Sequence, residues 1–153
     1  MISKNFKDIS LSTLGMGNMR LPTAGDKGSI DREKAREIIE YAYNNGVNYF
    51  DTAYRYHGGE SELVVGEILK QYPRDTWYLA SKMPGHMMYY KDGKLGFQGY
   101  LSDFKCDSIS EIFEEQLKKC QVEYFDFYLL HNVCESSFDF YTNEELGVVK
   151  YLL

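Results

Sequence analysis

The alternation of strand-like and helix-like segments constrains this chain more than any other feature of its sequence. Apolar, strand-like runs lie at 11–19, 47–51, 76–83 and 124–131. Amphipathic, helix-like segments lie at 31–46, 61–71 and 108–120, and 142–153 could begin another. This order predicts parallel strands joined by right-handed crossovers. Either a doubly wound sheet or a (β/α) barrel satisfies it.

Local signals support the helix predictions. Asp31 is a favourable N-cap, and Gly46 supplies a stop for the helix that follows it. One buried stripe is predicted on that helix at Ala35, Ile38, Ile39 and Ala42. Ser108 and Glu111 have capping-box spacing. The buried face of that helix is predicted at Ile109, Ile112, Phe113 and Leu117.

The connection 84–105 interrupts the alternation and is rich in Gly and Tyr. A connection of this length is typically either a functional lid or loosely ordered, and both readings stay open. His57 and His86 are predicted to be surface residues, because no metal-ligand cluster surrounds them.

Length and charge limit the class of protein. The 153 residues predict a single domain over 1–153. The net charge of −6, without a basic stripe, argues against nucleic acid or an anionic membrane as a partner. No signal peptide or membrane-spanning run is recognised, and Cys106, Cys120 and Cys134 have no metal-site spacing. We therefore expect a cytoplasmic protein with reduced thiols and no bound metal.

Ionisable side chains fall at the ends of three successive predicted strands. Asp51 ends the second strand, Lys82 the third and His131 the fourth, and Tyr56 lies just beyond Asp51. The carboxyl ends of parallel strands share one edge of the sheet, where active sites are built. We therefore expect these four side chains to meet there.

The four groups make chemical sense as a set. An ammonium favours the phenolate form of a neighbouring tyrosine, so Lys82 suits Tyr56 as a proton donor. Asp51 can hold Lys82 by an ion pair, and His131 can donate a hydrogen bond to a substrate oxygen. Together they fit protonation of a carbonyl oxygen. Each of them alone could instead be a turn cap, a solvated charge or a packing residue.

These residues resemble the aldo-keto reductase superfamily. The resemblance rests on "LGMGNMRLP", "GVNYFDTAYRYHGGESE", "YLASKMP" and "EYFDFYLLHN", and it covers the chain from about residue 9 onward. It implies a (β/α)8 TIM barrel and reduction of aldehydes or ketones with NADPH or NADH. It assigns Tyr56 as proton donor, Lys82 as its charged partner, Asp51 as the residue that orients Lys82, and His131 as the substrate-orienting group.

The resemblance also implies contacts with the nicotinamide half of the cofactor. These fall to Gly17, Asn18 and Met19, and Asp51 is expected to reach the nicotinamide ribose. The substrate would be a small carbonyl compound.

The length departs from the family pattern. A (β/α)8 barrel needs about 250 residues, whereas this sequence contains about four β/α units. We therefore expect a half barrel, truncated on its C-terminal side, without the family's phosphate anchors. An inactive fragment and a non-enzymatic nucleotide-sensing or interaction subunit are the alternatives to an enzyme. Self-association through the open half barrel is a further possibility.

Overall fold

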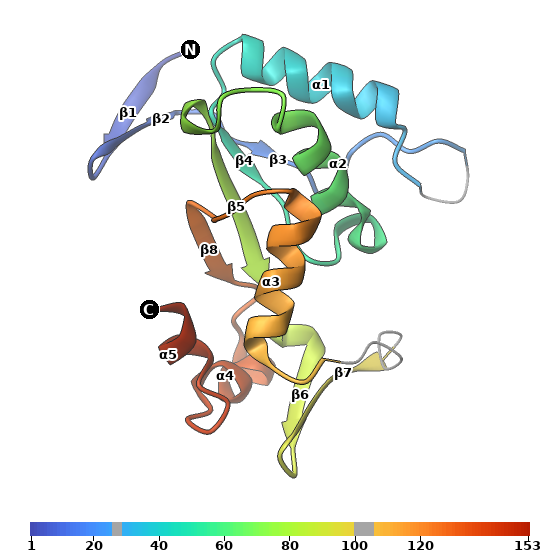
Figure 1. Ribbon diagram of the computed structural model, residues 1–153, viewed down its shortest axis with the longest axis vertical. Coiled ribbons are helices and arrows are strands. Elements are labelled where there is room, and N and C mark those ends of the chain that lie inside the picture. The colour runs from blue at the N-terminus through green and yellow to red at the C-terminus, as the bar shows by residue number, and fades with distance from the viewer. Residues whose placement is uncertain (26–28, 100–105) are drawn as a thin grey trace.

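A parallel sheet of four strands organises the molecule (Figure 1). The computed structural model describes residues 1–25, 29–99 and 106–153. The strand order is β3-β4-β5-β8, and β4 and β5 pair in the register Asp51 with Ala80. The strands of this sheet are β3 (Met16–Gly17), β4 (Tyr49–Asp51), β5 (Tyr78–Met83) and β8 (Phe127–Leu130). The predicted parallel alternation is confirmed.

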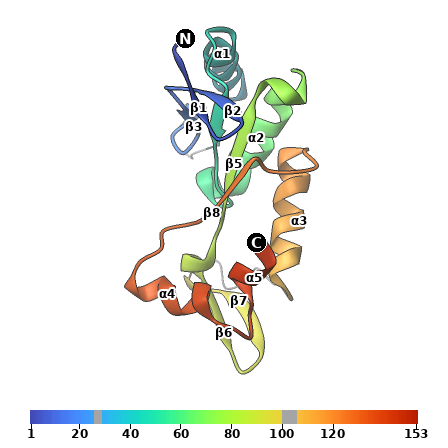
Figure 2. The same cartoon turned by 90° about the vertical axis from the view of Figure 1, so that its left-hand side faces the viewer.

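Three helices cover one face of this sheet (Figures 1 and 2). They are α1 (Arg32–Asn44), α2 (Glu60–Leu69) and α3 (Ile109–Cys120). Fully buried Ile39, Phe50, Val65 and Leu79 form part of the core between helices and sheet. Among the described residues, no helix covers the opposite face (Figure 2). Tyr128 of β8 bonds Gln116 of α3, so its neighbour Leu129 points to that open face, and Leu129 is 40% exposed.

Two antiparallel hairpins and two short helices complete the described part of the chain. The hairpins are β1 (Ser3–Phe6) with β2 (Ile9–Ser12) and β6 (Met88–Lys91) with β7 (Lys94–Phe97). The helices are α4 (Glu135–Thr142) and α5 (Val148–Leu152). Three single 3₁₀ turns lie at Tyr56–Gly59, Arg74–Thr76 and Gly85–Met87. A second core cluster, with Met83, Met88, Ile112 and Tyr141, lies below the carboxyl ends of the strands.

The predicted N-caps are confirmed, whereas the capping box and the predicted buried faces differ in part from the structure. Asp31 accepts a hydrogen bond from the Lys34 N–H, and Ser108 accepts one from the Glu111 N–H. The Glu111 carboxylate, however, accepts from the N–H of Asp107 rather than from that of Ser108. On α1 the prediction that Ile38 is buried is wrong. That side chain is 45% exposed, and Ala42 is only partly buried, so the buried stripe is narrower than predicted and consists of Ala35 and Ile39.

On α3 the buried face has moved relative to its prediction. Ile109 and Ile112 are buried, whereas Phe113 and Leu117 are only partly buried. Gln116 is fully buried with Cys120. A polar residue therefore occupies the position that packs against β5, and its partners are described below.

Residues 84–99 of the connection after β5 form a 3₁₀ turn and a hairpin, so the reading as loosely ordered is wrong for them. The tip of the β6–β7 hairpin is Asp92-Gly93, and both residues have positive φ, 52° and 71°. An Asp-Gly pair suits this turn because both positions require left-handed backbone. The remainder of the predicted connection, 100–105, lies outside the described residues.

Candidate functional site

The four predicted site residues meet at the carboxyl edge of the sheet. The Lys82 Nζ lies 2.6 Å from the Asp51 Oδ1 and 2.7 Å from the Thr52 carbonyl oxygen. The same Nζ lies 4.7 Å from the centre of the Tyr56 ring. The Tyr56 and His131 rings are 5.7 Å apart and nearly perpendicular. Three neighbouring strand ends thus bring an acid, an ammonium, a phenol and an imidazole together.

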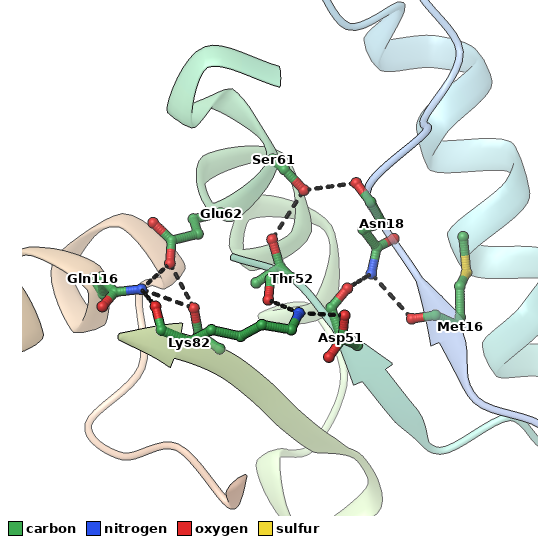
Figure 3. Close-up of polar contacts among 9 residues, drawn as sticks. Met16, Asn18, Asp51, Thr52, Ser61, Glu62, Lys82 and Gln116 are labelled. Atoms are coloured by element: carbon green, nitrogen blue, oxygen red, sulfur yellow. Dashed lines mark hydrogen bonds and ion pairs between the residues drawn. The ribbon is translucent and has the colours of Figure 1, made fainter. Parts of the chain in front are cut away.

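The ion pair between Asp51 and Lys82 is shielded from solvent. Their side chains are 26% and 12% exposed, respectively. Asn18 fixes the Asp51 backbone, since its N–H and its side-chain amide both donate to the Asp51 carbonyl oxygen, at 2.8 and 2.9 Å (Figure 3). The pair is therefore held at a set place on the edge of the sheet.

A tight turn places Tyr56. The three residues after it, His57, Gly58 and Gly59, all have positive φ, at 52°, 69° and 97°. This conformation is unusual for a residue with a side chain, so His57 must be held by its surroundings. Its Nε2 accepts a hydrogen bond of 2.9 Å from the Leu21 N–H. The turn reverses the chain before α2 and leaves Tyr56 over Lys82.

His131 is anchored through its backbone. Its N–H donates to the Met83 carbonyl oxygen at 3.1 Å, and the Tyr141 hydroxyl lies 2.6 Å from the His131 carbonyl oxygen. Burial, together with the neighbouring His86 and Lys82, lowers the pKa of His131 to about 4. The imidazole is thus neutral near pH 7 and keeps one N–H for donation.

We expect the His131 imidazole in the folded protein to titrate near pH 4, measured by NMR of ¹⁵N-histidine-labelled protein. The urea-unfolded chain, where the pKa is about 6.5, is the control. Because the folded pKa is the lower one, the unfolded chain takes up the extra proton. The stability that neutral His131 contributes is complete above pH 6.5 and is lost as the pH falls toward 4. A folded-state midpoint near 6.5 would contradict this.

The prediction that His57 and His86 are surface residues is only partly correct. Both are partly buried, and the His86 ring lies 4.5 Å from that of His131. They line a cavity of about 290 Å³ whose other lining residues are Met19, Arg55, Tyr56, Met87 and His131. A Cβ on Gly85 would lie 2.7 Å from Phe140 and still closer to the Tyr141 ring. The close packing of Gly85 against α4 positions the neighbouring His86. The sequence alone did not indicate this contact, because a single glycine carries no signal of what it packs against.

The three residues predicted to face a nicotinamide differ in accessibility. Gly17 and Met19 are exposed at the sheet edge, and Met19 lines the cavity. Asn18 is fully buried, and its amide points into the sheet. Its side chain therefore serves the backbone of Asp51 rather than the surface. Among the described residues, no group of three or more His, Cys, Asp or Glu side chains is placed to hold a metal ion.

Comparison with known proteins agrees with this site and fold. The model of the Aldo/keto reductase family matches residues 13–145, and the chain belongs to that family. Its structural relatives are aldo-keto reductases, whose fold is the (β/α)8 TIM barrel. Within the described residues, no helix is both long and apolar enough to cross a membrane.

Three relatives indicate the degree of similarity. The chain is 32% identical over 123 residues to the probable aldo-keto reductase 1 of Glycine max, covering 80% of this chain and 33% of that protein. It is 30% identical over 129 residues to the NADH-specific methylglyoxal reductase of Escherichia coli, covering 81% and 39%. The holo form of aldo-keto reductase AKR11C1 from Bacillus halodurans is 29% identical with a TM-score of 0.57, covering 92% and 43%. The chain thus spans well under half the length of each.

Proposed function

We propose that this chain supplies the proton-transfer groups of a nicotinamide-dependent carbonyl reductase. The observation that carries the proposal is the placement of Lys82, which pairs with Asp51 at 2.6 Å and lies over the ring of Tyr56. A structural ion pair has no need of a phenol and an imidazole at the same edge of the sheet. Membership of the aldo/keto reductase family supports the same reaction class.

Each residue has a defined task in this reaction. Tyr56 donates its proton to the carbonyl oxygen of an aldehyde or ketone, and the Lys82 charge stabilises the phenolate that remains. Asp51 holds the ammonium in place. Neutral His131 donates its N–H to the same carbonyl oxygen and orients it. The nicotinamide cofactor, NADPH or NADH, supplies the hydride.

The residues at the sheet edge fit the nicotinamide half of that cofactor. A Cβ on Gly17 would meet nothing within 4 Å, so the surface beside Asp51 is open to a flat ring. Met19 is 54% exposed and can cover one side of such a ring. Asn18 is buried, backbone included, so it would act indirectly, by holding the backbone of Asp51 in place.

A second candidate is an inactive fragment or a non-enzymatic nucleotide-sensing or interaction subunit. The observation that favours it is the open sheet. Among the described strands, β3 and β8 each have one neighbour, as in half of a barrel. Two copies that pair across these edges could form a closed sheet. Self-association of this kind would make the carbonyl reductase function compatible with the open sheet of one copy.

The experiment that separates the candidates is a fluorescence titration of NADPH, and in parallel NADH, into the purified 153-residue protein. We expect saturable, stoichiometric binding, followed by oxidation of the cofactor when a small aldehyde is added. The mass in solution is measured by analytical ultracentrifugation on the same sample. Binding without turnover would favour the nucleotide-sensing role, and no binding by a folded chain would favour the inactive fragment.

A further inference from the structure

A buried carboxyl group lies directly behind the site, on the helix side of the sheet (Figure 3). Glu62 of α2 is completely inaccessible to solvent. Its Oε1 accepts a hydrogen bond of 2.7 Å from the Ser81 hydroxyl and one of 2.6 Å from the Gln116 Nε2. The two donors come from β5 and α3. One oxygen atom therefore joins two helices to the strand that carries Lys82.

Glu62 and Gln116 bind β5 at two neighbouring residues, Ser81 and Lys82. The Gln116 Nε2 lies 2.9 Å from the Ser81 Oγ and 3.3 Å from the Lys82 carbonyl oxygen. Successive side chains of a strand point to opposite faces. When Ser81 is fixed toward the helices, Lys82 is directed to the other face, where Asp51 and Tyr56 lie.

The surroundings of Glu62 favour its neutral form. Its Oε2 is buried and has no hydrogen-bond partner among the described residues. The nearby Lys119 pairs instead with Glu115, at 2.6 Å. An unpaired carboxylate at such a place would be costly. Burial raises the pKa of Glu62, against the opposing effects of the bonds from Ser81 and Gln116 and of the Lys119 charge.

We propose that Glu62 is a positioning residue for Lys82, and that as a neutral hydrogen-bond hub it fixes the end of β5 through Ser81 and Gln116. Its contribution to turnover rests on the function proposed above. The effect of Glu62 on the position of Lys82 does not depend on that function. The position of Lys82 and the turnover are therefore measured separately.

The test compares Glu62→Leu with Glu62→Gln. Glutamine keeps an oxygen for both donors, whereas leucine fills a similar space and removes the acceptor that Ser81 and Gln116 share. The primary readout is the acetylation rate of Lys82 by an N-hydroxysuccinimide ester, resolved by peptide mass spectrometry and divided by the rate at exposed Lys70. We expect Glu62→Leu to raise this ratio on the order of tenfold, because the strand end loosens and the ion pair opens. Glu62→Gln should leave it within about twofold of wild type.

Two further variants keep the test decisive. Glu115→Leu removes a carboxylate from α3 that binds Tyr54 and Lys119 but does not touch β5, and it should leave Lys82 protected. Ser81→Ala removes one of the two hydrogen bonds to Glu62 and should raise the acetylation ratio by a smaller factor. This variant replaces Glu62→Leu in the test if Glu62→Leu does not fold. Unchanged protection in Glu62→Leu, or in Ser81→Ala where Glu62→Leu does not fold, would overturn the proposal. If Glu62→Gln lost as much protection of Lys82 as Glu62→Leu, the proposal that Glu62 acts as a neutral hydrogen-bond acceptor would be wrong.

Turnover is the second readout. If Lys82 acts in catalysis, Glu62→Leu lowers kcat while the affinity for NADPH stays near that of wild type. A raised acetylation ratio with unchanged kcat would support the positioning of Lys82 and count against its role in the proposed reaction.

Discussion

Replacing Tyr56 by phenylalanine is expected to lower kcat/KM for carbonyl reduction by about 10²–10⁴-fold, the usual contribution of a general acid. The change removes only the hydroxyl group. The ring that faces Lys82 at 4.7 Å and His131 at 5.7 Å is kept, so the packing of the site is preserved. Affinity for NADPH should therefore change little. Steady-state kinetics with a small aldehyde and a fluorescence titration measure the two quantities.

The neighbouring tyrosine provides a matched control. Tyr54 is buried, and its hydroxyl donates to the Glu115 carboxylate at 2.7 Å, on the helix side of the sheet. Tyr54→Phe removes the same atom two residues away and should leave turnover close to wild type. Full turnover in Tyr56→Phe would show that Tyr56 is not the proton donor of the reaction.

Gly66→Ala is expected to lower the free energy of unfolding by about 2–3 kcal/mol, the cost of forcing an added methyl group into a packed core. Gly66 lies where α2 crosses the last turn of α3. A Cβ there would lie 2.7 Å from the Cys120 Cα and still closer to its carbonyl group. These are backbone atoms, so no side chain can turn aside and the helices must separate. The higher helix propensity of alanine, about 1 kcal/mol, offsets only part of this cost.

Urea unfolding followed by circular dichroism measures this loss. Gly17→Ala makes the same chemical change where the added Cβ meets nothing within 4 Å. Its free energy of unfolding should stay within about 0.5 kcal/mol of the wild-type value. A Gly66→Ala midpoint equal to that of Gly17→Ala would mean that α2 and α3 are free to move apart.

The elements that sequence reasoning placed correctly are those with strong periodicity. The strands β4, β5 and β8 lie within the predicted strand segments, α1 and α3 fall within the predicted helical segments, and α2 begins one residue before its own. The convergence of Asp51, Lys82 and His131 followed from parallel topology, because each lies at or just after a strand end, and Tyr56 joins them through the turn that follows β4. Their catalytic roles stay predictions until the kinetics are measured.

What sequence reasoning missed depends on tertiary contacts or on a short turn signal. Asp92-Gly93 between "MYYK" and "KLGF" is a hairpin signal that was passed over within a long connection. The place of His86 is set by contact of Gly85 with α4, far along the chain. Gln116 was not included in the predicted buried face of its helix, yet it is buried and bonded to Glu62 and Ser81, partners that only the folded chain brings to it.

The ion pair between Asp51 and Lys82 joins residues 31 positions apart, and no local segment of the chain contains both. A parallel pair of strands forms only after the intervening crossover has closed, and loops of this length form late and slowly. His131 comes from a strand still further along the chain. During refolding, α1 and α2 can form while the site does not yet exist. The site therefore depends on contacts between residues far apart in the sequence, and we expect it to form late in folding.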